Sequence, residues 1–410
     1  MKVLVWQWGR RGGAPRFAAG LARGFAALDG VEALLSLAAD AEILRGADAP
    51  PCALPVATYR GIAGLIWRAL LAPMMVHRLS AALRRLRPDL AVCAQPGPLD
   101  LAMVAALRRA GVPLAVIVHD ATPHPGDGVP LLFALQRALI RRAGTVVVLS
   151  EHVAAALRAQ RALRPGAQLV VAAHPPVAFG VIAPPDAHPG PRRVLSFGRL
   201  LPYKGLDLLA DALRLLGPRP DLDVRVVGQG PESAVLAALR ALPGVTVENR
   251  WVPEDEIGPL LGWSDIVVLP YREASQSGVA AAALAAGRRV VATRVGGLAG
   301  QLADEPLAVL CAPEAAALAA ALADALQPMP GRPAQPVPTD DGWRRLAAIV
   351  RDRASPAIDA TAAPGARESA ACPKSTACPK STACPGAGDP RCPDRPSFGP
   401  TPPGSPPPPR

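Results

Sequence analysis

The chain has 410 residues, of which 50% are hydrophobic, and it carries a formal net charge of +11. This length predicts about two compact domains, and the basic excess favours an anionic partner: a nucleotide phosphate, a membrane surface or a nucleic acid. Aromatic residues make up only 4% of the chain, and no zinc-finger or RNA-binding motif is present. Nucleic acid is therefore the least compatible of the three and is not expected as a partner.

The chain begins MKVLVWQW, in which Met-Lys passes directly into an apolar strand. Such a start leaves no room for a signal-peptide core with a cleavage site, and no uncharged apolar run approaches the roughly 20 residues of a membrane span. Cys52, Cys93 and Cys311 are isolated from one another, as expected of reduced thiols. We therefore expect a cytoplasmic protein.

The first half alternates apolar strands with helical stretches. Strands are predicted at 3–6 and 145–150 and within 88–97, 112–120 and 168–176. The Gly-rich turn after the first strand opens a helix, so an anion could bind the amides of Gly12 and Gly13. The same turn needs glycine for its geometry alone, and both interpretations stay open.

Residues 60–87 carry six Arg and no Asp or Glu, interleaved with large apolar side chains. A basic amphipathic segment of this kind could lie peripherally on the anionic inner face of a membrane. The alternative is an ordinary domain helix whose Arg face is solvated. The sequence leaves both interpretations open.

His119 and Asp120 end a nearly pure apolar strand, which favours a ligand role over a structural one. The first domain is predicted to end at 176, and the Pro-rich segment 177–192 is predicted as a linker.

Residues 193–325 repeat the strand and helix alternation and predict a second doubly wound parallel sheet. Strands are predicted at 193–198, 223–227, 245–249, 265–270 and 289–293, with helices at 204–216, 231–241, 254–262 and 277–286. One last helix is expected at 342–353. The Pro-rich tail, 354–410, is predicted to be disordered.

Four tail cysteines, Cys372, Cys378, Cys384 and Cys392, lie within or just after near-tandem STACPK repeats. Divergence of a low-complexity repeat explains this spacing better than a zinc site does.

Arg199 follows a predicted strand and Lys204 opens the predicted helix behind it, so two cations face one crevice at the sheet's edge. They suit a diphosphate, although a solvated surface pair is the alternative. Ser277 with the amides of Gly278 and Val279 forms a second anion cradle at a helix start. Ser277 could instead be only the N-cap.

These residues lie in a longer pattern. The runs VLSFGRLLPYKGLDLL, VRVVGQGPE, VENRWVPEDEIGPLLGWSDIVVLPYREASQSGV and GRRVVATRVGGL resemble, in order and spacing, the nucleotide-binding domain of retaining glycosyltransferases of family 4. These are two-domain GT-B enzymes, and GGAPRFAAGLA and VIVHDATPHPGD are similar to their acceptor domain. The resemblance covers roughly residues 1–325 and implies two Rossmann-like domains that face a central cleft.

The resemblance implies that Arg199 and Lys204 bind the diphosphate of a nucleotide-sugar donor. The amides of Gly278 and Val279 would cap its outer phosphate, and Gly13 would approach the same phosphates from the other domain.

It further implies that His119 touches the transferred sugar and that Glu273 hydrogen-bonds its hydroxyls. The base would rest on backbone near Arg250 and Val252. The second glutamate of the family's motif falls on Ala281, so the usual acceptor for the ribose hydroxyls is missing.

The resulting expectation is a metal-independent retaining glycosyltransferase that needs no cofactor. Its partners would be a nucleotide sugar and a glycan or lipid-linked acceptor. The alternatives are a non-catalytic nucleotide-sugar-binding relative and a GT-B sugar-nucleotide epimerase.

Overall fold

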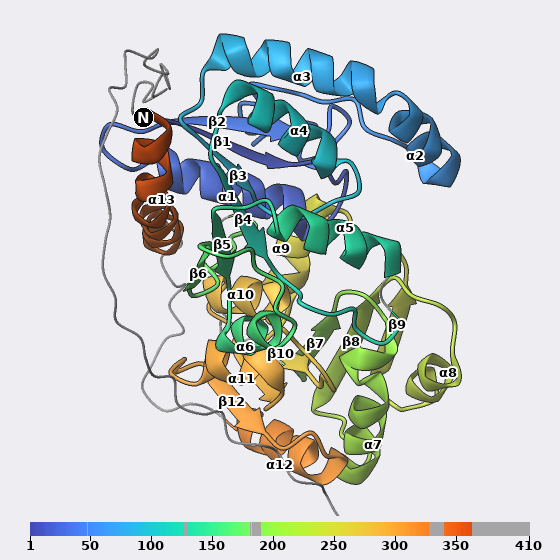
Figure 1. Cartoon of the computed structure of the whole chain (residues 1–410). Coiled ribbons are helices and arrows are strands. Elements are labelled where there is room, and N and C mark those ends of the chain that lie inside the picture. Colours follow the sequence, from blue (N-terminus) through green and yellow to red (C-terminus); the bar gives the residue numbers. More distant parts are fainter. Residues whose placement is uncertain (47, 127–129, 181, 183–189, 328–339, 363–410) are drawn as a thin grey trace, which may run out of the picture. The chain divides into compact units, whose positions relative to one another are not determined.

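The computed structural model describes residues 1–46, 48–126, 130–180, 182, 190–327 and 340–362, all within a compact unit that spans Met1–Pro364. Two six-stranded sheets organise it (Figure 1). Every strand pair in both sheets is parallel. The predicted fold class, two Rossmann-like domains, is thereby confirmed. The tail cysteines and residues 181 and 183–189 of the predicted linker lie outside the described residues.

The first sheet has the strand order β2-β1-β3-β4-β5-β6. Its strands are β1 (Lys2–Gln7), β2 (Glu32–Leu37), β3 (Leu90–Cys93), β4 (Leu114–Val118), β5 (Thr145–Val148) and β6 (Gln168–Val171). Its helices are α1 (Gly13–Ala26), α2 (Gly61–Leu70), α3 (Ala72–Leu86), α4 (Asp100–Ala110), α5 (Pro130–Ile140) and α6 (Glu151–Ala159), with a 3₁₀ turn η1 (Glu42–Leu44).

The second sheet has the order β12-β11-β10-β7-β8-β9. Its strands are β7 (Arg192–Phe197), β8 (Leu222–Gly228), β9 (Val245–Asn249), β10 (Ile266–Leu269), β11 (Arg289–Thr293) and β12 (Ala308–Cys311). Its helices are α7 (Leu206–Leu216), α8 (Ala234–Arg240), α9 (Glu254–Trp263), α10 (Gly278–Ala285), α11 (Gly296–Leu302) and α12 (Ala315–Ala325), with a 3₁₀ turn η2 (Pro202–Lys204).

Each sheet is buried on both faces. Alternate residues of β1 point to opposite sides, so Val3 and Val5 belong to one apolar cluster and Leu4 and Trp6 to another. The second sheet divides in the same way. Burial on both faces explains why these strands appear in the sequence as continuous apolar runs.

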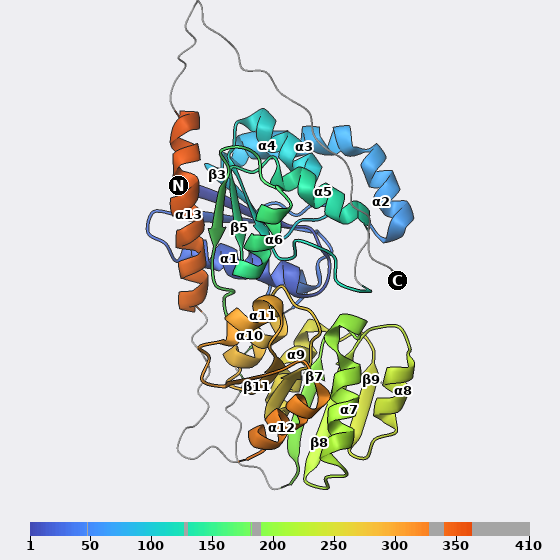
Figure 2. The ribbon, with the colours of Figure 1, turned by 60° about the horizontal axis from the view of Figure 1, so that its bottom comes forward.

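The last helix, α13 (Asp340–Ala362), begins two residues before and ends nine residues after the predicted 342–353. The prediction of disorder from residue 354 is therefore wrong for the first residues of that segment, while 363–410 lie outside the described part. α13 packs on α1, as Figures 1 and 2 both show. Trp343, which is buried, enters this contact, and a Cβ at Gly20 would lie 2.5 Å from its ring. Glycine is required there because any side chain would displace α13.

A second correction concerns Lys204, which does not open a helix. It ends the η2 turn, Gly205 follows with φ +63°, and α7 begins at Leu206. A Cβ at Gly205 would lie 1.8 Å from the carbonyl oxygen of Pro270, so the break needs glycine for both its backbone angle and its space. The break sets Lys204 in the loop beside the end of β10 rather than on the helix.

Among the described residues, no single helix is long and apolar enough to cross a membrane. The pair α2 and α3 passes that test together, but the two helices meet at an angle of 71°.

Candidate active site

A cavity of about 750 Å³ is lined by residues that follow the carboxyl ends of strands in both sheets. This is the edge at which parallel α/β sheets bind ligands. Eight predicted site residues line it, namely Gly13, His119, Arg199, Lys204, Val252, Ser277, Gly278 and Val279. The structure thus brings together residues that are up to 266 positions apart in the sequence, as between Gly13 and Val279.

Arg199 and Lys204, both from the second half of the chain, supply two cations to the cavity wall. Nη2 of Arg199 donates a hydrogen bond of 2.7 Å to the hydroxyl of Tyr203, which fixes the guanidinium. Nζ of Lys204 lies 3.7 Å from the ring centroid of Tyr271, in cation–π contact. Burial lowers the pKa of Lys204 to about 8, and the positive charge of Arg199 contributes to that shift.

Ser277 is the N-cap of α10. Its hydroxyl accepts a hydrogen bond of 3.1 Å from the amide of Ala280, and its own amide donates to Oε1 of Gln301 at 2.8 Å. The capping alternative is therefore observed. The following residues, Gly278 and Val279, begin the helix, where backbone N–H groups have no acceptor within the helix, and both line the cavity. Such amides can bind an anion.

A second helix start faces the same cavity. α1 begins at Gly13 after Gly12, whose φ of +83° is in the left-handed region. No atom lies within 4 Å of the position that a Cβ of Gly13 would take. Two helix N-termini, one from each half of the chain, thus line one cavity.

His119 follows β4 directly and is buried against the ring of Phe17, with 4.7 Å between ring centroids. Phe17 also contacts Trp343 of α13, with 5.0 Å between ring centroids. Nε2 is 3.0 Å from the carbonyl oxygen of Ala94. Because a carbonyl only accepts, Nε2 carries the proton and Nδ1 is an acceptor. Burial lowers the pKa of His119, so the ring is neutral near pH 7.

His124 was not identified from the sequence, although it lines the cavity. Its Nε2 is 3.2 Å from Oδ1 of Asp120, and its Nδ1 is 3.5 Å from Oε2 of Glu273. Its ring stacks on Tyr203 with 4.7 Å between centroids. The hydrogen bond to Asp120 raises the pKa of His124. The sequence signal for His124 was its position in the Pro/Gly-rich loop that follows His119. A loop sequence does not show which distant residues, here Glu273 and Tyr203, its side chains contact.

Asp120 also lines the cavity as a carboxylate. Burial would raise the pKa of Asp120, but hydrogen bonds from His124 and Ser275 outweigh burial and lower it. Two further lining residues, Phe17 and His174, were missed because nothing in their local sequence marks them. Burial lowers the pKa of His174 to about 4, so this ring is neutral as well.

Two predicted residues do not line the cavity. Glu273 is half exposed and faces His124. The guanidinium of Arg250 is paired with Glu248 at 2.9 Å and with Glu256 at 2.7 Å. Ala281, where the family's second glutamate would stand, is buried in an apolar cluster of the first half.

Comparison with known families agrees with this geometry. The sequence profile described as Glycosyltransferase Family 4 matches residues 11–174, and the profile described as Glycosyl transferases group 1 matches residues 191–328. The boundary between the two matched profiles, at residues 174–191, coincides with the boundary between the two sheets.

Individual relatives match shorter segments. The 2-deoxystreptamine glucosyltransferase of Streptomyces kanamyceticus is 30% identical over 242 residues, which are 52% of this chain and 61% of that protein. The D-inositol 3-phosphate glycosyltransferase of Arthrobacter sp. (strain FB24) is 34% identical over 184 residues, which are 42% of this chain and 44% of that protein. The chain therefore spans only part of the length of these relatives.

The crystal structure of HepE from Anabaena in complex with UDP and glucose has a TM-score of 0.60 at 20% identity, covering 88% of this chain and 98% of that one. At this identity the likeness is one of fold. The two family profiles together span most of the chain, one on each sheet, and the protein therefore belongs to the group 1 glycosyltransferases of family 4.

Proposed function

We propose that the protein is a cytoplasmic retaining glycosyltransferase that moves a sugar from a nucleoside-diphosphate donor to a glycan or lipid-linked acceptor without a metal ion. The observation that carries this proposal is the convergence of Arg199, Lys204 and the helix starts at Gly13 and Gly278 on one cavity. A diphosphate matches two cations and two sets of amides. HepE binds UDP and glucose, which supports the same class of donor here.

The chemistry follows from where charge develops. Cleavage between the anomeric carbon and the diphosphate leaves negative charge on the departing phosphate and positive charge on the sugar. We assign the phosphate charge to Arg199, Lys204 and the amides of Gly278 and Val279, which are already oriented and therefore stabilise it without reorganisation. Retention would require the departing phosphate to take the acceptor's proton on the same face of the sugar.

We assign the sugar to the opposite wall. Nδ1 of His119 would accept a hydrogen bond from a sugar hydroxyl, because Nε2 is already committed to Ala94. Glu273 would reach the sugar only if it turned away from His124. The backbone at Val252, which lines the cavity, is the position proposed for the base.

Non-catalytic binding is the second candidate, and the buried Ala281 favours it because no carboxylate stands there for the ribose hydroxyls.

A thermal-shift panel of UDP, GDP, ADP and CDP sugars, with and without chelator, would identify the donor. Product analysis with acceptor sugars would then test turnover. We expect one donor to raise the unfolding temperature with chelator present and to be consumed only in the presence of an acceptor.

Other outcomes separate the alternatives. A shift that disappears with chelator contradicts metal independence. A donor that changes stereochemistry without any acceptor identifies an epimerase. Donor binding without turnover across the acceptor panel identifies a non-catalytic binder. In that case His119→Ala and the unaltered protein should show the same background consumption of the donor.

A further inference from the structure

The outer surface of α2 and the start of α3 expose a run of large apolar side chains. Ile62, Ile66, Trp67, Leu70 and Met74 are 79%, 57%, 62%, 69% and 44% exposed. With Leu131 and Leu132 on α5 they make up seven of the eight exposed large apolar residues in the described part of the chain. We call these seven residues the apolar patch. Exposed apolar residues on a solvated surface are normally scattered singly, so a concentration of this kind marks an interaction site.

α2 itself has no buried residue, although it is a regular helix of 10 residues. Ile62, Ile66 and Leu70 recur every four residues and so form one stripe along it. A short helix gains little stability from propensity alone and normally forms by burying an apolar face. The exposed stripe of α2 is therefore a face that the described residues leave uncovered.

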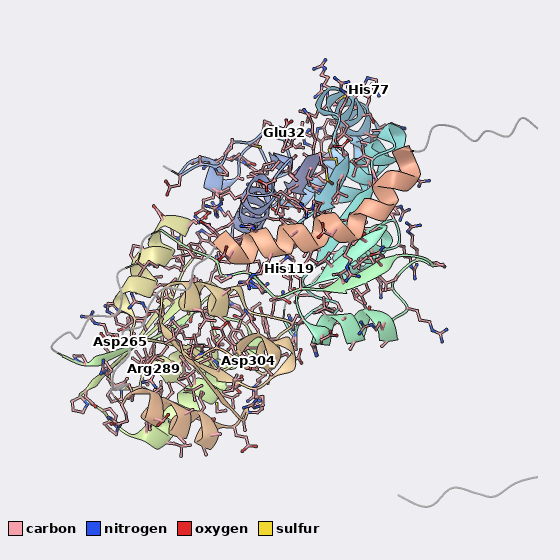
Figure 3. The ribbon with its side chains drawn as sticks, turned by 90° about the vertical axis from the view of Figure 1, so that its left-hand side faces the viewer. Glu32, His77, His119, Asp265, Arg289 and Asp304 are labelled. Carbon is pink, nitrogen blue, oxygen red and sulfur yellow. The ribbon has the colours of Figure 1, made fainter. Side chains whose placement is uncertain are left out.

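The next helix supplies positive charge. The inner face of α3 is buried through Val76, Leu79 and Leu83. Its outer face exposes His77, Arg78, Arg84 and Arg85, whose spacing of three to four and seven residues places them on one stripe with Met74. Figure 3 shows His77 pointing outward from this region. We call these four residues the basic stripe.

The basic stripe is not neutralised locally. Residues 60–87 contain no Asp or Glu. Within the described chain, the only ion pair of this segment joins Arg60 to Asp40, at 3.2 Å. The charges of Arg78, Arg84 and Arg85 are thus available to an anionic surface.

α5 carries exposed apolar side chains to the cavity. It packs on α4, which in turn packs on α3. Leu132, a member of the apolar patch, also lines the cavity, and so does its neighbour Phe133. Exposed apolar side chains on α5 thus reach the wall of the candidate active site.

We propose that the apolar patch and the basic stripe dock the protein on a lipid bilayer with anionic headgroups. Apolar side chains that enter the acyl boundary, flanked by Arg that pairs with headgroup phosphates, are the combination that an interfacial helix requires. A second copy of the chain is disfavoured, because a symmetric contact through this face would bring two basic stripes together. This surface does not depend on the proposed donor chemistry.

Co-sedimentation of the full chain with phosphatidylcholine vesicles, with or without phosphatidylglycerol, tests this proposal. We expect binding that requires phosphatidylglycerol and weakens as salt is raised. Ile66→Ser combined with Trp67→Ser should weaken vesicle binding by at least about tenfold, since two apolar insertions are lost. Arg84→Glu combined with Arg85→Glu should weaken it by a similar factor.

Matched controls lie elsewhere on the chain. Leu215→Ser removes the remaining exposed leucine, 63% exposed on α7, and Arg344→Glu with Arg345→Glu reverses the same amount of charge on α13. Both should bind vesicles like the unaltered protein. Circular dichroism and binding of the nucleotide-sugar donor establish folding without reference to lipid.

Several results would overturn the proposal. These are equal binding to vesicles without anionic lipid, equal losses in patch and control variants, or no vesicle binding at all. A patch variant that abolishes self-association in ultracentrifugation while leaving vesicle binding unchanged would assign the surface to a second copy instead.

Discussion

The two walls of the cavity differ in kind. The wall from the second half presents the cations Arg199 and Lys204 and the amides at the start of α10. The wall from the first half presents Phe17, His119 and His174, and burial lowers the pKa of both histidines. The first of these walls thus concentrates positive charge, whereas the second combines neutral rings with charged side chains, among them Arg11 and the carboxylate of Asp120. In the proposed function, the wall from the second half binds the leaving group and the wall from the first half orients the sugar.

The largest expected effect tests the charged wall. Arg199→Ala or Lys204→Ala should lower UDP affinity, or that of whichever nucleoside diphosphate binds, by at least about tenfold, because a charge-assisted bond contributes roughly 1.5–3 kcal/mol. Calorimetry measures this. His119→Ala should leave the affinity for the sugar-free diphosphate within about twofold. An equal loss in all three variants would contradict the division between the walls.

The next effect is a pH dependence on the charged wall. Because the pKa of Lys204 is lowered to about 8, its charge in the free protein is present below pH 8 and lost above it. Diphosphate affinity should therefore fall above pH 8, with a limiting slope of about tenfold per pH unit. The neighbouring Tyr271 does not interfere, since burial raises its pKa to about 12.

Lys204→Arg is the control for that slope, because a guanidinium stays charged throughout this range. Its affinity should change little between pH 7 and pH 9. The same slope in this variant and in the unaltered protein would show that another group titrates.

The smallest effect concerns the residue that joins the walls. His124→Phe keeps a ring to stack on Tyr203 but loses the contacts to Asp120 and Glu273. We expect kcat/KM to fall by about fivefold, corresponding to about 1 kcal/mol. His124→Ala, which loses the stack as well, should fall further. If kcat/KM of His124→Phe equals that of the unaltered protein, the stacking contact with Tyr203 alone positions this loop.

The sequence predicts the sheets well for a physical reason. Strands such as β4, with all five residues buried, are apolar without interruption and cannot be mistaken for loops. β2 escaped prediction because it is an edge strand whose first half is only partly buried, from exposed Glu32 onward. The start of α7 was misplaced by two residues, since only the close approach of Pro270 to Gly205 shows why the helix does not begin at Lys204.

Site residues could be predicted from the sequence where a single local segment contains both the binding group and the secondary-structure signal that places it. Gly278 and Val279 stand at a helix start that the sequence marks by its Ser and Gly. Arg250 is a different case: only its backbone was predicted to hold the base, and the residue does not line the cavity, while its guanidinium pairs with Glu248 and Glu256. The contacts of His124 with Glu273 and Tyr203 depend on how the halves fold together, which no local pattern encodes.

The return of α13 to α1 has a consequence for biosynthesis. The apolar cluster of the first half includes Trp343, Leu346 and Val350, which follow the whole second sheet in the sequence. Domains generally fold in order as the chain emerges from the ribosome, but here the first domain lacks part of its core until the second has been synthesised. The surface of α1 around Gly20 therefore stays uncovered until α13 has been synthesised, and the core of the N-terminal domain is completed after that of the second domain.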